Sequence, residues 1–357
     1  MARRRAAADR RSSPIATALV AWHKKHGRHD LPWQQQTGVY AQWISEVMLQ
    51  QTQVATVVPY YQRFMQEFPD VSALAAAPLD RVLHLWSGLG YYSRARNLHR
   101  AAQLIVEQHG GKLPLKIDAL CALPGIGRST AAAILALSGG KRHAILDGNV
   151  RRVLARYFLV AGAQTDPTVE RKLWKRAERC TPTRHVALYT QAIMDLGAMV
   201  CVRSRPLCAV CPLRAGCGAR RTHRQQEFPS PRAQRARRTK RTVMLLAVRE
   251  DGAVLLERRP NQGIWGGLWA PPQFQRLDDA RIYAIDRLRT AQLQTQPPVR
   301  HAFTHFELEI TPLLVRCEGF AGVMEPAEMQ WHDPRFPDAI GLPAPVSVLI
   351  GRLADMM

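Results

Sequence analysis

The sequence lacks any apolar run that approaches the roughly 18 residues needed to cross a bilayer as a helix, so we expect no transmembrane segment. Its first 13 residues, MARRRAAADRRSS, also lack the continuous apolar core of a secretory signal peptide. We therefore expect an intracellular protein that begins with a disordered basic arm over residues 1–13. An organelle-targeting segment, which is likewise Arg-rich and poor in acidic residues, is the alternative interpretation of this arm.

Acidic residues are also scarce, because 28 Asp and Glu stand against 50 Lys and Arg and leave a net charge of +22. The excess is rich in Arg, whose planar guanidinium suits bidentate contacts with phosphate. A solvated surface or an anionic membrane could also account for the charge, but the sequence shows no basic amphipathic helix of the membrane-surface kind. The charge therefore favours a nucleic acid as the partner.

What the sequence does contain changes in character along the chain. Residues 14–217 carry apolar residues at helical spacing, residues 218–242 are Arg-rich and nearly free of apolar side chains, and residues 243–350 carry short β-type runs. We predict an all-α domain, a basic solvated linker and an α+β domain, for which 357 residues are long enough. Helices are predicted over 15–22, 43–61, 74–86, 98–106, 131–137, 150–159, 189–200 and 280–293, and strands over 243–248, 253–256 and 303–315.

Four of the seven cysteines crowd into 201-CVRSRPLCAVCPLRAGC-217, with the spacing C-x6-C-x2-C-x5-C. In a reducing compartment such crowding indicates a metal centre rather than disulfides. Structural zinc normally uses two chelating pairs, whereas one pair with wider outer spacings suits a [4Fe–4S] cluster, so we predict the cluster and keep zinc as the alternative. The Arg residues at 203, 205 and 214 would face phosphate. The predicted ligands are Cys201, Cys208, Cys211 and Cys217.

The stretch 121-CALPGIGRSTAAAI-134 places a glycine turn between two helical patterns. Backbone N–H groups around Gly125 and Gly127, together with the N-terminus of the following helix, would form an anion-binding site. Asp147 follows in 147-DGNV-150, directly before another helical pattern. From spacing alone, Asp147 is an ordinary helix N-cap.

The hairpin LPGIG, Asp147 and the four-cysteine loop together resemble the helix-hairpin-helix DNA glycosylase superfamily of the endonuclease III type. Within it, 31-LPWQ-34, 46-EVMLQQTQV-54, 88-GLGYYSRARNLH-99 and 194-MDLGAMVC-201 resemble the MutY-type adenine DNA glycosylases, over nearly the whole chain. The resemblance implies base excision repair, in which adenine mispaired with 8-oxoguanine or guanine is removed from double-stranded DNA. It also implies a monomer in the bacterial cytoplasm, on the nucleoid.

Ser129 follows the hairpin at the position where bifunctional members of the superfamily carry a lysine that forms a Schiff base with the sugar. A hydroxyl cannot form an imine, so the resemblance implies a monofunctional glycosylase that leaves an abasic site. Ser129 could still hydrogen-bond Asp147 or a water molecule. Two alternatives stay open: a bifunctional lyase for pyrimidine lesions, and a catalytically silent DNA-binding protein.

Hydrolysis of an N-glycosidic bond calls for two carboxylates in different environments, and the resemblance assigns these roles to Glu46 and Asp147. Glu46 lies in WISEVML, where apolar neighbours would raise its pKa and let it protonate N7 of adenine. Asp147 would stay ionised beside helix N–H groups and stabilise an oxocarbenium-like intermediate. Asn149 would help to hold the site. Without the resemblance, Glu46 would be an exposed helix residue.

The resemblance also implies DNA contacts. Extrusion of a base from the duplex is assisted by intercalating side chains, and Gln50, Gln51 and Tyr91 match the family's wedge residues. Their alternative interpretations are a polar helix surface for the glutamines and core packing for Tyr91. The predicted contacts with the DNA backbone are Gly125, Gly127, Arg128 and Arg151.

Residues 243–350 resemble the Nudix-like domain that recognises 8-oxoguanine in this family, through 263-GIWGGLWAPPQF-274 and 303-FTHFELEI-310. A Nudix hydrolase holds magnesium with a Glu-rich helix, and 276-RLDDARIYAIDRL-288 has no REXXEE pattern, so we expect binding without hydrolysis. The predicted contacts with the lesion are Phe303, Thr304 and His305. Phe303 and Phe306 could instead pack in the core along a strand.

Overall fold

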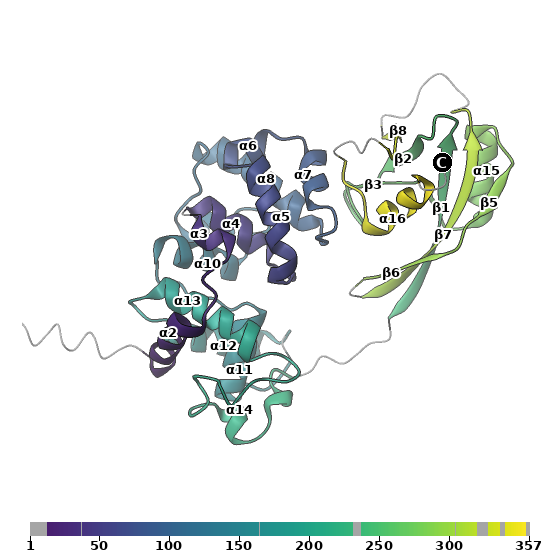
Figure 1. The fold of residues 1–357 in the computed structure, drawn as a ribbon. Helices are drawn as coiled ribbons and strands as arrows, with labels where there is room; N and C mark the ends of the chain where they lie inside the picture. Colours follow the sequence, from purple (N-terminus) through teal and green to yellow (C-terminus); the bar gives the residue numbers. More distant parts are fainter. Residues whose placement is uncertain are drawn as a thin grey trace, which may run out of the picture. The chain divides into compact units, whose positions relative to one another are not determined.

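The computed structural model describes residues 13–36, 38–163, 165–230, 237–303, 305–319, 328–335 and 340–354. Within them, the predicted order of a helical part followed by an α+β part is confirmed (Figure 1). Residues 1–12 of the expected basic arm lie outside the described residues, and so does Thr304. Among the helices that the structure describes, none has the length and apolar character to pass through a membrane.

The helical part consists of short helices whose ends carry clear sequence signals. Pro14 and Pro167 occupy the first turns of their helices, and Asp147 and Asp166 cap the helices that follow them by accepting backbone N–H bonds. The elements are α2 (Pro14–His26), α3 (Pro32–Gln35), α4 (Val39–Met48), α5 (Val54–Glu67), α6 (Val71–Ala76), α7 (Leu79–Trp86), α8 (Ser93–His109), α9 (Ile117–Cys121), α10 (Arg128–Gly139), α11 (Gly148–Phe158), α12 (Pro167–Cys180), α13 (Val186–Asp195), the π-helix η2 (Leu196–Val200), α14 (Gly218–Arg221) and the 3₁₀-helix η3 (Gln225–Glu227).

The α+β part is built on one sheet in which β1 and β7 lie side by side in parallel along their full length (Figure 1). The sheet has the order β3-β2-β1-β7-β5, with β4 on β1, β6 on β7 and β8 on β2. The elements are β1 (Arg238–Arg249), β2 (Val254–Arg258), β3 (Trp269–Ala270), β4 (Gln273–Phe274), α15 (Leu277–Leu288), β5 (Leu293–Thr295), β6 (Val299–Ala302), β7 (Phe306–Cys317), β8 (Met329–His332) and α16 (Ala344–Ala354).

Several sequence-based boundaries differ from the structure. The predicted helix 74–86 is divided between α6 and α7, and the predicted helix 280–293 ends at Leu288. The predicted helix 43–61 is in fact two helices, α4 and α5, separated by a turn at Gln51, whose φ is 61°. The sequence does not reveal this turn, because the apolar pattern continues through it. The predicted strand 303–315 begins only at Phe306, and Phe303 lies in the turn after β6. Strand β1 begins inside the predicted linker. The sequence gives no sign of its first four residues, because they are exposed and show no apolar alternation.

Contacts between residues divide the chain into two compact units. Unit 1 comprises Met1–Ala75 and Arg100–Gln234, and unit 2 comprises Ala76–His99 and Arg235–Met357. Segment 76–99, which holds α7 and the start of α8, therefore belongs with the sheet. The reason is close packing within unit 2: the Tyr92 hydroxyl donates to the Leu342 carbonyl at 3.3 Å, and a Cβ on Gly341 would lie 2.7 Å from Cβ of Leu83.

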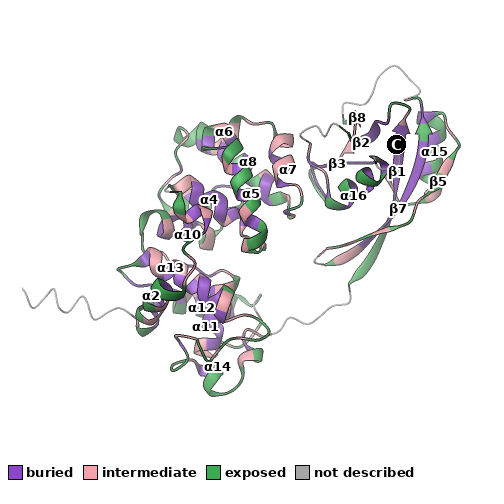
Figure 2. Cartoon of the chain, in the orientation of Figure 1, coloured by how far each residue is buried: buried purple, intermediate pink, exposed green. Residues whose placement is uncertain are grey.

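Each unit has a hydrophobic core of its own (Figure 2). In unit 1, Leu19 of α2, Leu154 of α11 and Ile193 of α13 are almost completely buried in one cluster. In unit 2, a second cluster forms where α15 covers one face of the sheet, with Leu245 and Leu313 at its centre. Burial in unit 1 thus comes from helix on helix, and in unit 2 from helix on sheet.

Candidate active site

Glu46 lies on α4 among side chains that are almost completely buried, such as Trp43, Val47 and Met48. The side-chain amide of Gln42, one turn earlier, donates to Oε1 of Glu46 at 3.0 Å. Burial and the nearby charge of Asp147 raise the pKa of Glu46 to about 7, while the hydrogen bond from Gln42 opposes the rise. Glu46 can therefore carry a proton near neutral pH.

Asp147 is the N-cap of α11, and its Oδ1 accepts the backbone N–H of Val150 at 2.7 Å. We predict from the sequence that such contacts keep Asp147 ionised. They do act in that direction, and so do the charges of Arg152 and Arg151, but burial is the larger effect and raises the pKa of Asp147 above its usual range. The capping contacts limit a rise that burial causes.

Ser129 lies in the first turn of α10, and its hydroxyl accepts the backbone N–H of Leu146 at 2.9 Å. This bond joins the hairpin helix to the residue directly before Asp147. This contact uses the hydroxyl as an acceptor, and the prediction that Ser129 bonds Asp147 or a water molecule stays a prediction. Ser129 therefore fixes the approach of the chain to Asp147.

Asn149, in the first turn of α11, packs against the π-helix η2. A Cβ on Gly197 of the π-helix would lie 2.6 Å from Cβ of Asn149, so this helix can approach only because residue 197 is glycine. Arg152 bridges the two elements, because one nitrogen donates to Oδ1 of Asn149 at 2.7 Å and to the Gly197 carbonyl at 2.6 Å, and another donates to the Cys201 carbonyl at 2.7 Å.

The four predicted ligands, Cys201, Cys208, Cys211 and Cys217, line one cavity in unit 1. Among the residues that the structure describes, no group of three or more His, Cys, Asp or Glu side chains is arranged to hold a single metal ion. Two of the sulfurs receive side-chain N–H groups, since Arg156 donates to Sγ of Cys201 at 3.4 Å and Gln225 to Sγ of Cys208 at 3.8 Å.

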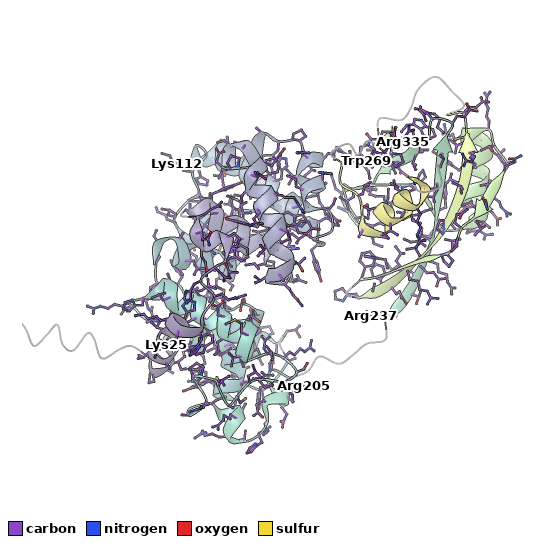
Figure 3. All side chains as sticks on the ribbon, in the orientation of Figure 1. Lys25, Lys112, Arg205, Arg237, Trp269 and Arg335 are labelled. Carbon is purple, nitrogen blue, oxygen red and sulfur yellow. The ribbon has the colours of Figure 1, made fainter. Side chains whose placement is uncertain are left out.

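Arg156 is buried and fastens the cysteine loop to α11. Its guanidinium donates to the carbonyls of Val202 at 2.7 Å and Arg203 at 2.8 Å, and to that of Phe228 at 3.0 Å. The three interleaved arginines are exposed on the same loop, where Figure 3 labels Arg205. They are Arg203, Arg205 and Arg214.

The hairpin joins α9 to α10 through Gly125, whose φ of 77° favours glycine, and Gly127, which caps α10. The side-chain amide of Gln50 reaches this hairpin and donates to the Gly125 carbonyl at 3.4 Å and to the Thr130 hydroxyl at 3.3 Å. The structure thus brings together a predicted wedge residue and a predicted phosphate-binding turn.

Both predicted phosphate-binding arginines contact α12. Arg128 lies 3.9 Å from the ring centre of Trp174 and pairs with Glu178 at 2.7 Å, and Arg151 pairs with Glu170 at 3.0 Å. The side chain of Arg151 is only 16% exposed. Because the three α12 residues are spaced four apart, they form one stripe along that helix.

Two predicted wedge residues have left-handed backbone conformations that non-glycine residues rarely adopt. Gln51 has a φ of 61° and Tyr91 a φ of 53°, and both side chains are exposed, Tyr91 by 43%. The guanidinium of Arg94 lies 5.5 Å from the centre of the Tyr91 ring. Such backbone strain gathers at functional sites. Gln51 belongs to unit 1 and Tyr91 to unit 2.

In unit 2, Phe303 and His305 lie between the end of β6 and the start of β7, and Thr304 lies outside the described residues. The Phe303 ring stacks on Phe306, with ring centres 4.5 Å apart. Sequence reasoning missed two further rings beside Phe303, which belong to Trp265 and His301. It also missed Gln42, although the spacing of four residues before Glu46 on a helix was a usable signal.

Two family models match the chain. Residues 44–179 match the model described as "HhH-GPD superfamily base excision DNA repair protein", and residues 243–352 match the model described as "NUDIX domain". Together these matches fall on both the helical part and the α+β part.

Comparison with individual proteins gives similarity over most of the chain. An adenine DNA glycosylase of Buchnera aphidicola subsp. Acyrthosiphon pisum is 36% identical over 334 residues, which cover 93% of this chain and 95% of that protein. An adenine DNA glycosylase of Mus musculus is 35% identical over 81% of this chain and 68% of its own length. The solved structure of a thermostable thymine-DNA glycosylase matches 60% of this chain and 98% of that chain, with 25% identity and a TM-score of 0.54.

Proposed function

This chain belongs to the adenine DNA glycosylase family of helix-hairpin-helix repair proteins, and from that membership we propose that it excises adenine mispaired with 8-oxoguanine or guanine in duplex DNA. The family resemblance and the fold predicted from the sequence, a helical glycosylase part followed by a Nudix-like module, are confirmed. The observation that carries the proposal is the pair of carboxyl groups, Glu46 and Asp147, whose pKa values are both raised in unit 1.

The two carboxyl groups would share one proton near neutral pH, since burial and mutual repulsion oppose two negative charges. We place this proton on Glu46, because Asp147 accepts the N–H of Val150 and is thereby better able to stay charged. Glu46 would donate the proton to N7 of adenine, which weakens the bond between N9 and C1′ of the sugar. Asp147 would then stabilise the positive charge that develops on the sugar.

Water would complete the reaction by adding to C1′, with its proton passing to a carboxylate of the pair. The products would be free adenine and an abasic site. Ser129 supports hydrolysis without strand cleavage, because a serine has no amine that could form a Schiff base with the sugar. Its hydroxyl already accepts the backbone N–H of Leu146. The protein would therefore act as a monofunctional glycosylase.

Adenine must leave the base stack to reach these groups. The strained, exposed positions of Gln51 and Tyr91 support their role as wedges, and the contact of Gln50 with the hairpin supports a role beside them. Gly125, Gly127, Arg128 and Arg151 would hold the DNA backbone. The partner would be double-stranded DNA bound by one copy of the chain.

The cysteine loop fits an iron–sulfur cluster, because four thiols line one cavity and two of them already receive N–H groups. Cys201, Cys208, Cys211 and Cys217 would hold a [4Fe–4S] cluster, which when bound would lock the loop that carries the exposed arginines. Iron and acid-labile sulfide analysis of the purified protein would yield four of each per chain. Stoichiometric zinc without sulfide would overturn this assignment.

The test of the activity is excision from duplexes with adenine opposite 8-oxoguanine, guanine, cytosine or thymine, alongside a thymine:guanine duplex. We expect excision of adenine opposite 8-oxoguanine and guanine, with no covalent product after borohydride treatment. Preferential loss of thymine would place the chain with a different glycosylase activity. Borohydride-linked protein would show a Schiff base and refute the monofunctional mechanism.

A further inference from the structure

Trp265 has an unusual conformation for a large side chain. It lies in the loop between β2 and β3 with a φ of 57°, in the left-handed region, yet it is only 7% exposed. The flanking Gly263 and Gly267 have φ values of 92° and 76°, so the loop reverses direction around the tryptophan. A bulky residue keeps such a conformation only when its surroundings hold it there.

The surroundings of Trp265 are the rings of the turn between β6 and β7. Its ring centre lies 5.8 Å from that of Phe303 and 6.1 Å from that of His301. His301 meets Phe303 edge to face at 4.7 Å, and Phe306 stacks on Phe303 at 4.5 Å. The backbone N–H of Phe303 also donates to the Phe306 carbonyl at 2.9 Å, which closes the turn. Phe303 is therefore bounded by three rings, of which Trp265 alone comes from another loop.

The loop that carries Trp265 is itself held by segment 76–99. The guanidinium of Arg96 on α8 donates to the carbonyl of Gly266, and Cδ of Arg96 lies 3.6 Å from the position of a Cβ on Gly267. A Cβ on Gly266 would lie 2.4 Å from the Asn261 carbonyl oxygen, so the loop tolerates only glycine there. Contacts thus run from α8 through this loop to Phe303, all within unit 2.

We infer that Trp265 is a positioning residue for lesion recognition, which acts by holding the Phe303 ring in the pose that contacts 8-oxoguanine. The inference rests on the proposed function, in which the turn at Phe303 reads the lesion. Trp265 itself need not touch DNA, because its effect passes through the neighbouring ring. Arg96 supports the same pose one step further away, through the backbone of the loop.

The first test measures lesion preference, defined as the ratio of dissociation constants for duplexes that hold an uncleavable adenine analogue opposite guanine or opposite 8-oxoguanine. In the full-length protein, Trp265→Ala should lower this ratio roughly three- to tenfold, the range expected for loss of one aromatic contact. Trp265→Phe should keep most of it, because a ring remains. Trp331→Ala, on β8 beside Arg249, is the matched control and should leave the ratio unchanged.

A double-mutant cycle then separates positioning from general destabilisation. If Trp265 acts through Phe303, Trp265→Ala should have no further effect on lesion preference in a Phe303→Ala background. A preference that stays within twofold of the parent, equal weakening of both duplexes, or additive effects in the cycle would each overturn the inference. If the alanine variant fails to fold, Trp265→Leu replaces it, because leucine fills part of the space but removes the ring, and the same loss of preference is expected.

The same cycle distinguishes this inference from the function on which it rests. A lowered preference in Phe303→Ala together with additive effects of Trp265→Ala would reject the positioning role alone. A Phe303→Ala variant with unchanged preference would reject the turn as the site of lesion recognition, and the inference with it.

Discussion

The candidate sites of the two units consist of different kinds of side chain, carboxyl groups in unit 1 and aromatic rings in unit 2. Unit 1 gathers ionisable groups, Glu46 and Asp147, in a place where burial raises the pKa of both. Unit 2 gathers the rings of Trp265, His301 and Phe306 around Phe303. Buried carboxyl groups are costly and indicate proton transfer, whereas clustered rings cost little and offer a surface for stacking. The difference supports the proposed function, in which unit 1 carries the chemistry and unit 2 the recognition of the lesion.

The sharpest way to break this comparison is to remove the acid. Glu46→Gln should lower the single-turnover rate of adenine excision by roughly 10²- to 10⁴-fold, the usual contribution of a general acid. Affinity for the duplex should change little, because the wedge and hairpin residues are intact. Glu107→Gln, an exposed carboxylate on α8, is the matched control. A Glu46→Gln rate within threefold of the parent would contradict the proposed mechanism.

The pH dependence sharpens the comparison further. With a pKa of about 7, Glu46 loses its proton as pH rises, so the excision rate should fall about tenfold per unit once pH is well above 7. The hydrogen bond from Gln42 favours the carboxylate form of Glu46, so Gln42→Met should raise the pKa of Glu46 and move this fall in rate, the basic limb of the pH profile, to higher pH. Lesion preference should stay flat over the same range. A limb that does not move in Gln42→Met would argue against Glu46 as its source.

The smallest expected effect concerns the stripe on α12. Glu178 forms an ion pair with Arg128 and so competes with a DNA phosphate for its guanidinium. Glu178→Gln should therefore tighten DNA binding roughly two- to fivefold, in line with the small energy of exposed ion pairs. The salt dependence of binding should also steepen, by up to about 0.9 in the logarithmic slope. Arg128→Gln should act in the opposite direction. Weaker binding in Glu178→Gln would mean that the pair instead holds Arg128 ready for DNA.

Sequence alone could predict the parts of the site that depend on chemistry carried by short motifs. Glu46, Asp147 and the four cysteines stand in such motifs, and the structure places Asp147 where its charge raises the pKa of Glu46. What sequence could not supply are contacts across long separations. Ser129 bonds Leu146, and Trp265 contacts Phe303, only because the fold brings distant segments together.

Backbone turns within continuous apolar patterns were also beyond the sequence. Gln51 interrupts a run that looks like one helix, since the apolar spacing on either side stays in phase. Segment 76–99 has the pattern of an ordinary part of the helical stretch, and its contacts in the folded chain, such as those with Gly341 and Leu342, assign it to unit 2. Local pattern predicts an element, but not the neighbour against which it packs.

The pairing of β1 with β7 has a mechanical consequence. Arg238, the first residue of β1, is the register partner of Phe306, which closes the turn beside Phe303. Because the two strands pair in parallel along all 12 residues of β1, the start of β1 lies level with that turn and not at the far end of β7. A change in the exposed first residues of β1 would therefore reach this corner of the sheet before it reached the other end of the strand.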